Sequence, residues 1–326
     1  MMLNLKEILK NGANKKEVRL VVCEGWDERC LKATAEVQNI VKITLLGNPE
    51  EINKKAKELS LDISKAEIHD YKNSELKEEL TNKLLEARKH KGMTLEQAQK
   101  LIEDENYFGC VYCLAGHANA VAGSAIGSTA ALMKPALQLL REKGRTVSEV
   151  SILNDVKNNR TLFGTDFSLN INPSSEALAQ MAANAAECAT ELGVEPRVAL
   201  LSFSTKGSGG DGEEIQQVRE AIKIIKENNP ELVVDGEMQV DAAVDPEAAE
   251  KKCPDAIIKG DANVLVFPNL VASNIFAHGI LQFSEMELAF TIIKGMATPT
   301  AILGRSSPLE TVRLMFLSCA LQVNSQ

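Results

Sequence analysis

The sequence predicts an α/β protein of two domains, with mostly parallel sheets flanked by helices. Three observations lead to this prediction. The chain has 326 residues, which is longer than a domain with a single hydrophobic core usually is, and 44% of its residues are hydrophobic. Short apolar runs alternate along it with long amphipathic segments, as expected of a sheet built from strand–helix units. The sequence contains no internal repeat, low-complexity tract or linker-like stretch, so we expect two domains joined without a flexible linker.

Six apolar runs are predicted to be strands. Several consist largely of Val, Ile, Leu and Ala, which is typical of strands buried on both faces of a parallel sheet. The six runs are residues 18–23, 41–46, 147–153, 197–204, 262–267 and 300–303.

Longer amphipathic segments are predicted to be helices, and two helix starts have recognisable caps. Ser174 precedes a helix with an acidic residue in its first turn, so its hydroxyl can accept from the first amide groups. Asn48 stands directly before Pro49, and proline is favoured at the first helical position. The four clearest helical segments are residues 73–90, 94–103, 174–192 and 212–228.

Composition and charge narrow the classes of function. Charged residues make up 25% of the chain and its net charge is -9, with no basic stripe of the kind that binds nucleic acid. The longest apolar runs, such as Val264–Pro268, are far shorter than a membrane span. The N-terminal sequence lacks the apolar core of a signal peptide, and seven scattered cysteines fit reduced thiols. We therefore expect a cytoplasmic protein with no nucleic-acid or membrane partner.

The first candidate site is the glycine-rich segment Ser204–Gly210, which follows one predicted strand and precedes a predicted helix. Its glycines allow backbone N–H groups to converge, and the helix N-terminus adds partial positive charge, so the segment suits a phosphate. It matches neither the P-loop nor the dinucleotide-binding pattern. A flexible connection that binds nothing is the alternative.

Two further segments also suit an anion. Small and hydroxyl residues at 123–129 lead into a helix that carries Lys134, although Ser128 or Thr129 could simply cap that helix. Arg88 ends a long helix and is followed by three more residues of basic type, Lys89–Lys91. These cations suit a polyphosphate such as that of coenzyme A, but they also suit the negative end of a helix dipole in solvent.

The remaining polar motifs favour structural roles. In the segment 24–29, Asp27 and Glu28 complement a helix N-terminus, and Arg29 could reach into a cleft. Cys110 and Cys113 form a CxxC pair without a second pair or a histidine at zinc spacing, and their flanks predict a buried helix. We therefore expect packing thiols there and no metal site.

Stretches distributed over nearly the whole chain resemble the phosphate acetyl/butyryltransferase family. Two of them, STKGSG (204–209) and the DGE-Q-DAA stretch beginning at 235, are typical of the acetyl branch. All the stretches follow the family order: EGWDER (24–29), RKHKGMTLEQA (88–98), ENYFG (105–109), STAALMKPALQ (128–138), EPRVALLSFSTKGSG (195–209), DGEMQVDAAVDPEAA (235–249), ANVLVFPNLVASNI (262–275) and the GR of ILGRSSPLETV (302–312).

The resemblance implies a fold of the isocitrate/isopropylmalate dehydrogenase-like type. Its first domain would comprise residues 1–146 and 298–326, its second residues 147–297, with the active site in the cleft between them and a homodimer as the assembly. The implied reaction is reversible acetyl transfer between coenzyme A and phosphate, by attack of the thiolate on the acyl carbonyl in a ternary complex. Coenzyme A, acetyl-CoA, phosphate and acetyl phosphate would be substrates, with no metal and no tightly bound cofactor.

The resemblance also assigns residues to this reaction. Arg305 corresponds to the C-terminal active-site arginine, Lys134 stands where the acetyl branch has a phosphate-binding arginine, and Ser128 is the third catalytic candidate. Arg88 corresponds to a helix-end arginine associated with coenzyme A. The implied substrate-binding residues are Thr129, Ser204, Thr205, Lys206, Gly207, Ser208, Gly209, Arg88, Asn274 and His278.

Several positions differ from the acetyl branch. Lys134, Thr311 and the pair Thr165-Asp166 are closer to the butyryl branch. Three functions therefore stay open: an acetyl transferase, a butyryl or propanoyl transferase, and a catalytically impaired homologue that binds coenzyme A or phosphate. The departures are Gly304 for Ser, Thr311 for Asp, Phe167 for Cys, Ala277-His278 for Tyr-Lys, Gly127 for His, Ala131 for Asp and Asn269 for Asp.

Overall fold

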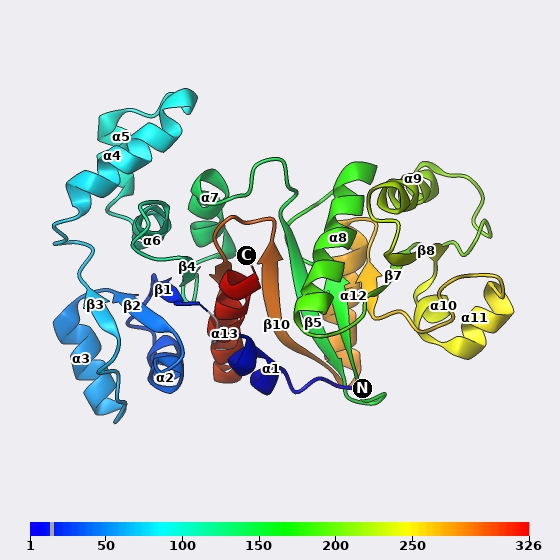
Figure 1. The fold of residues 1–326 in the computed structure, drawn as a ribbon, viewed down its shortest axis with the longest axis horizontal. Coiled ribbons are helices and arrows are strands. Elements are labelled where there is room, and N and C mark those ends of the chain that lie inside the picture. The colour runs from blue at the N-terminus through cyan, green and yellow to red at the C-terminus, as the bar shows by residue number, and fades with distance from the viewer. Residues whose placement is uncertain (14–15, 326) are drawn as a thin grey trace. The chain divides into compact units, whose positions relative to one another are not determined.

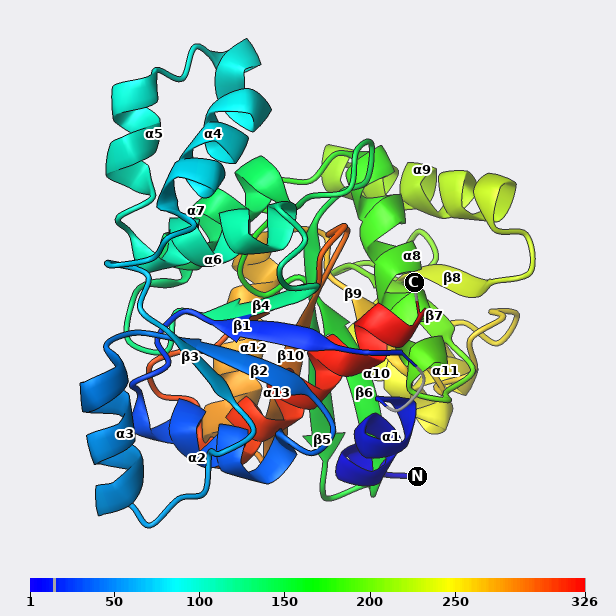
Figure 2. The same cartoon turned by 60° about the vertical axis from the view of Figure 1, so that its left-hand side comes forward.

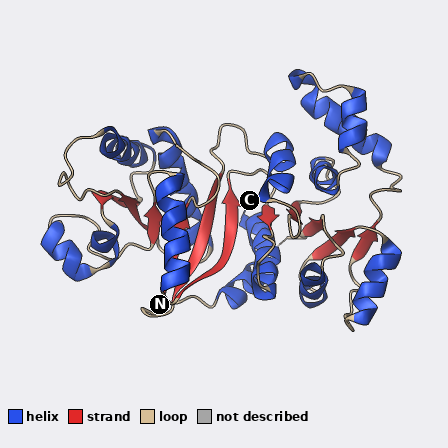
Figure 3. Cartoon of the chain, turned by 180° about the vertical axis from the view of Figure 1, so that it is seen from behind, coloured by secondary structure: helices blue, strands red, loops and turns tan. Residues whose placement is uncertain are grey.

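The computed structural model describes residues 1–13 and 16–325, which form two compact units. The flanking unit comprises Leu5–Lys143 and Met296–Gln326, and the inserted unit comprises Gly144–Gly295 together with Met1–Asn4. Helices flank the strands of each unit (Figure 3). The predicted fold class, α/β with mostly parallel sheets, is confirmed.

The flanking unit contains a five-stranded parallel sheet of order β11-β4-β1-β2-β3. The last strand in sequence, β11, pairs with β4, and Thr300 lies opposite Val121. The chain therefore returns from the inserted unit to complete this sheet. Its elements are α1 (Leu5–Gly12), β1 (Arg19–Val22), α2 (Glu28–Val37), β2 (Lys42–Leu46), α3 (Pro49–Glu58), β3 (Glu67–His69), α4 (Lys77–Arg88), the 3₁₀-helix η1 (Lys89–Lys91), α5 (Leu95–Leu101), α6 (Glu105–Leu114), β4 (Ala120–Gly123), α7 (Thr129–Leu139), β11 (Thr300–Ile302) and α13 (Leu309–Ser325).

Helices cover both faces of this sheet. Helices α6 and α7 pack together on one face, whereas α1, α2 and α13 pack together on the other (Figure 1). Helices α4 and α5 lie side by side as a hairpin (Figure 2). Because both faces are covered, residues 20–22 of β1 and all four residues of β4 are buried, as parallel strands require.

The inserted unit contains a six-stranded sheet of order β10-β5-β6-β9-β7-β8. Strand β5 pairs antiparallel with β6 and with β10, and the other pairs are parallel. The elements of this unit are β5 (Ser148–Asp155), β6 (Arg160–Thr165), α8 (Ser175–Glu191), β7 (Arg197–Leu201), α9 (Glu213–Asn228), β8 (Val233–Met238), α10 (Val240–Val244), α11 (Pro246–Lys252), β9 (Val264–Val266), α12 (Leu270–Phe283) and β10 (Met286–Lys294).

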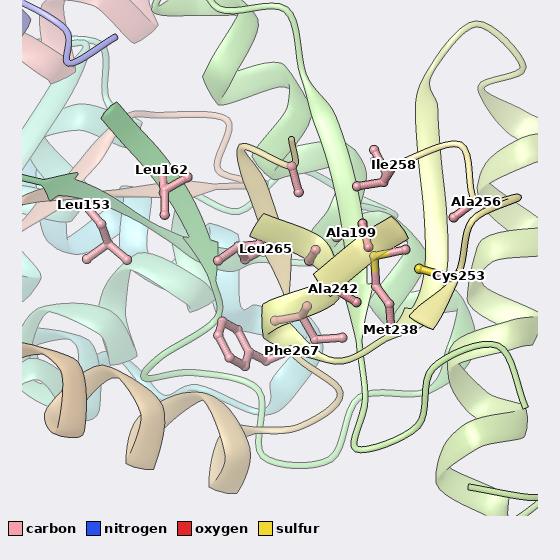
Figure 4. Packing of buried hydrophobic residues seen from close by; sticks show 14 of the residues in the cluster. Leu153, Leu162, Ala199, Met238, Ala242, Cys253, Ala256, Ile258, Leu265 and Phe267 are labelled. Carbon is pink, nitrogen blue, oxygen red and sulfur yellow. The ribbon is translucent and has the colours of Figure 1, made fainter. Parts of the chain in front are cut away.

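A hydrophobic cluster on one face of this sheet joins its strands to α10, α11 and α12 (Figure 4). Leu265 of β9 and Ala199 of β7 contribute from the middle of the sheet, and Ala242 and Ala277 contribute from α10 and α12. Helices α8 and α9 pack together and contact the strands as well. The strands that carry the cluster are therefore shielded from solvent.

The six predicted strands are confirmed, as are the four predicted helices, with shifts of a few residues at their ends. Ser174 caps α8 by accepting from the amide of Ala177, and Asn48 caps α3 by accepting from Glu50 and Glu51. Five further strands among the described residues were not predicted, namely β3, β4, β6, β8 and β10.

The cysteines are packing residues. All seven are free and buried, including Cys110 and Cys113 of α6, as predicted. Burial raises the pKa of the Cys23 and Cys110 thiols well above the usual value, so both stay protonated and unreactive. Among the residues that the structure describes, no helix combines the length and the apolar character needed to cross a bilayer.

Truncating the core of the inserted unit should destabilise the protein strongly. Leu265 is 1% exposed in a strand with neighbours on both sides, so we expect Leu265→Ala to lower the free energy of unfolding by about 2–5 kcal/mol. Urea unfolding followed by circular dichroism measures this change. Ile257→Ala is the control, because Ile257 is 53% exposed, and its effect should be within about 0.5 kcal/mol. Equal losses in both variants would contradict the assignment of this core.

Candidate active site

The candidate residues fall into two groups, one in each unit. Ser128, Thr129, Lys134, Arg305 and Arg88 belong to the flanking unit. The inserted unit holds the other group: Ser204, Thr205, Lys206, Gly207, Ser208, Gly209, Asn274 and His278.

In the flanking unit, the loop between β4 and α7 is wrapped around the carboxylate of Glu24. This carboxylate follows β1, is 2% exposed, and accepts from the amides of Ala125 at 2.6 Å, Ile126 at 3.3 Å and Gly127 at 3.0 Å. The small residues at 123–129 were predicted to suit an anion. Three of their amides do converge on an anion, but it is a side chain of the same unit.

Arg29 connects the turn of residues 304–307 to the loop between β4 and α7. Its guanidinium donates to the carbonyl oxygens of Gly304 at 3.1 Å, Arg305 at 3.0 Å and Ser307 at 3.1 Å, and to that of Ala125 at 2.7 Å. Asp27, which caps α2, orients it with a hydrogen bond of 3.1 Å from Nε. Within the flanking unit, Arg29 therefore binds backbone carbonyls, which is a different role from reaching into a cleft.

The exposed polar groups of this region lie beside that loop. Arg305 is exposed and its Nε donates to the carbonyl oxygen of Gly127 at 3.2 Å. Ser128 occupies the N-cap position of α7, but its hydroxyl makes no capping hydrogen bond. Within the described part of the chain, no hydrogen bond or ion pair engages the exposed side chains of Ser128, Thr129 or Lys134. The hydroxyl groups at the start of α7 and the cationic groups of Lys134 and Arg305 are therefore accessible to a ligand.

Arg88 ends α4 and begins the basic turn η1. It is half-buried, and its Nε is buried without a hydrogen-bond partner among the described residues. Lys89, His90 and Lys91 are exposed. The left-handed Gly92, with φ +77°, then turns the chain towards α5. The predicted cluster of positive charge at this helix end is therefore present.

In the inserted unit, the glycine-rich segment is organised by the buried carboxylate of Glu237. The amide of Gly207 donates to this carboxylate at 2.7 Å, and the Ser204 hydroxyl donates to it at 3.0 Å. The amide of Gly209 donates in turn to the Ser204 hydroxyl at 2.9 Å. The other amides of the segment, from Thr205 to Gly210, bond to the segment itself or to the Glu237 carbonyl. Its role in binding an external phosphate therefore stays a prediction.

Charged partners surround Glu237. Although burial alone would raise the pKa of the Glu237 carboxyl, hydrogen bonds from Arg219 and from the Gly207 amide lower it to about 2. Lys206, predicted to face a phosphate, instead pairs with Asp235 and donates to the carbonyl of Gly236 at 2.8 Å. In this conformation the lysine therefore neutralises a carboxylate of β8.

Asn274 and His278 lie one turn apart on α12, and both are exposed. The amide of Asn274 donates to the carbonyl oxygen of Phe167 at 3.2 Å, which ties α12 to the turn after β6. The ring of Phe167 packs edge-on against Phe267, with centroids 5.6 Å apart. Phe167 is therefore part of the core.

The residues that organise both loops were not predicted. The resemblance assigned no role to Glu24 in the segment 24–29 or to Glu237 in the DGE stretch. A signal was present for Glu237, because two acids interrupt the apolar strand β8 and a buried acid needs a cationic partner. Among residues 1–13 and 16–325, no group of three or more His, Cys, Asp or Glu residues is placed to hold a metal ion.

Comparison with known proteins supports the resemblance. Residues 4–319 match the family model described as Phosphate acetyl/butaryl transferase. The chain is 40% identical over 309 residues to the phosphate acetyltransferase of Bacillus subtilis, covering 94% of this chain and 95% of that protein. It is 36% identical over 323 residues to that of Clostridium acetobutylicum, covering 95% and 96%. The solved phosphotransacetylase of Streptococcus pyogenes superimposes with a TM-score of 0.93 at 33% identity, covering 99% of this chain and 98% of that one.

The buried charge of Glu237 should make the stability of the protein depend on pH. Its pKa is about 2 in the folded protein against an ordinary 4.5, so its stabilising contribution is present above about pH 4.5 and is lost as pH falls towards 2. We expect Glu237→Gln to lower the free energy of unfolding by about 3 kcal/mol at pH 7, and by less at pH 3.

Urea unfolding at both pH values tests this expectation. Glu220→Gln is the matched control, because Glu220 is an exposed acid on α9 in an ion pair with Lys223 and should contribute less than about 1 kcal/mol at either pH. A Glu237→Gln deficit that does not shrink on acidification would show that the charge of Glu237 is not what stabilises the loop.

Proposed function

The chain belongs to the phosphate acetyl/butaryl transferase family, and on that premise we propose that it transfers an acetyl group reversibly between coenzyme A and phosphate. The observation that carries the proposal is similarity over nearly the whole chain to proteins named phosphate acetyltransferase, at 36–40% identity. Those names favour acetyl over longer acyl groups. They also favour an active enzyme over an impaired homologue.

In this reaction the coenzyme A thiolate attacks the carbonyl carbon of acetyl phosphate. A bond forms between the sulfur and the carbonyl carbon. The bond between that carbon and the bridging oxygen breaks, and phosphate leaves with its electron pair. Arg305 and Lys134 are the proposed cations for the negative charge that develops on the phosphate, and Ser128 and Thr129 are the proposed hydrogen-bond donors. All four side chains are exposed, and Arg305 is held beside the loop by its hydrogen bond to the carbonyl oxygen of Gly127, which supports this assignment.

Coenzyme A is proposed as a co-substrate and not as a resident cofactor, and no metal is required by these steps. Arg88 and the basic turn that follows it offer positive charge for its phosphates. Ser204–Gly209, Asn274 and His278 are proposed to contact the substrates from the inserted unit. Because free coenzyme A and phosphate are intracellular metabolites, we also propose a cytoplasmic location.

We propose further that two copies of the chain associate through α12. This helix is apolar, yet only Ser273 and Ala277 of it are buried, while Val271 is 63% and Ile275 68% exposed. Phe283 at its end is 89% exposed. An exposed apolar helix face of this kind normally marks an interface, and a symmetric pair would bury the same face on both copies.

Release of the coenzyme A thiol from acetyl-CoA tests the reaction. We expect release that requires phosphate and is faster than from butyryl-CoA. Arg305→Ala should lower kcat/KM by about 10²–10³-fold, the typical cost of removing one group that stabilises the transition state. Arg141→Ala, an exposed arginine in the same unit, is the control and should keep full activity. Release that does not depend on phosphate would refute the proposed reaction.

Light scattering coupled to gel filtration tests the assembly. The wild-type protein should have twice the chain mass of 35.4 kDa, and Val271→Glu should shift it towards a single chain because a charge would be buried at the interface. Leu95→Glu is the control, since Leu95 is an exposed residue of α5, and should leave the mass unchanged. A wild-type protein with the mass of one chain contradicts the proposed dimer.

A further inference from the structure

Glu24 makes a set of hydrogen bonds that its position after β1 does not require. It is 2% exposed, and its two oxygens accept from three consecutive amides of the loop before α7, about a hundred residues away in sequence. A buried carboxylate is costly unless such donors satisfy it. The three hydrogen bonds therefore stabilise the position of the acid and of the loop together.

The loop that Glu24 holds leads directly to the proposed phosphate-binding groups. Gly127 donates its amide to Glu24 and accepts from Arg305 Nε through its carbonyl oxygen. The next residue, Ser128, is the N-cap of α7. A shift of the loop would therefore move the Arg305 side chain and the Ser128 hydroxyl together.

The internal carboxylate also determines which donors remain for an external anion. Three amides in a row form a favourable site for a phosphate. Because Glu24 occupies these three amides, a phosphate beside them would meet a negative charge. The groups that remain for a phosphate in this region are the exposed side chains of Ser128, Lys134 and Arg305.

We propose that Glu24 is a positioning residue for acyl transfer: it holds the loop 125–127 so that Arg305 and Ser128 are aligned on the phosphate. Glu24 does not touch the substrate and acts through these groups. The inference rests on the proposed function, because it needs Arg305 to act on the phosphate.

A double-mutant cycle between Glu24→Gln and Arg305→Ala tests this role, with kcat and KM measured for phosphate in the direction that consumes acetyl-CoA and for coenzyme A in the direction that consumes acetyl phosphate. Glutamine has nearly the same shape, but its NH₂ group opposes the loop amides. We expect Glu24→Gln to lower kcat/KM for phosphate by about 10–100-fold, since a small misplacement of a catalytic group costs up to about 10²-fold. The KM for coenzyme A should change less than about 2-fold, because Arg88 lies on a different helix.

The cycle distinguishes positioning from a general loss of structure. If Glu24 acts through Arg305 and Ser128, the loss in the double variant should be clearly smaller than the product of the two single losses, because coupled residues are not additive. Effects that multiply, or a KM for coenzyme A that rises as much as the KM for phosphate, would overturn the proposal.

Two further variants keep the test decisive. Glu28→Gln removes an exposed carboxylate four residues away that pairs with Lys32, and it should retain wild-type kinetics. If Glu24→Gln does not fold, Glu24→Asp takes its place in the cycle, because it keeps the charge but withdraws it from the amides; a loss of about 3–10-fold with the same non-additivity is expected. An inactive wild-type protein would contradict the proposed function itself, whereas an active one unaffected by either substitution at Glu24 would contradict only this inference.

Discussion

Buried carboxylates that capture backbone amides are the interaction on which both candidate loops depend. Glu24 binds three amides of one loop, and Glu237 binds an amide and a hydroxyl of the other. The N–H groups of such loops have no partner in a helix or sheet, and those that are buried need a hydrogen-bond acceptor. In this protein the carboxylates of Glu24 and Glu237 are such acceptors. The conformation of the loops is thus set before any substrate arrives, which is what pre-organised catalysis requires.

Much of the fold could be predicted because strands buried on both faces must be apolar throughout, as Arg197–Leu201 illustrates. The strands that were not predicted lack such a run for definite reasons. Ala120–Gly123 is made of small residues, and Val233–Met238 contains two acids, whose cationic partners Lys206 and Arg219 lie outside the strand. Strand Met286–Lys294 lies at a sheet edge and is partly exposed, so its first half shows no continuous apolar pattern.

The candidate site was less predictable, because its internal contacts are long-range. The glycine-rich segment was predicted to suit a phosphate, and in the structure its Gly207 amide and Ser204 hydroxyl donate to the carboxylate of Glu237. Sequence spacing could not show that Glu237, thirty residues away, accepts from Gly207, or that Glu24 lies against the loop before α7. Arg305 was assigned through family resemblance alone, since nothing around it in the sequence marks it as functional. The structure adds its contact with the carbonyl of Gly127.

The pairing of β11 with β4 has a consequence for how the chain is made. A ribosome produces β4 early and β11 only after all of Gly144–Gly295 has been synthesised. The inserted unit can complete its sheet while β4 of the flanking unit still lacks its partner β11. The N-terminal part of the flanking unit must therefore stay partly folded until translation ends. Interrupted synthesis would leave that edge unpaired, and unpaired edges promote aggregation. Nascent chains stalled before residue 300 are therefore natural clients for chaperones.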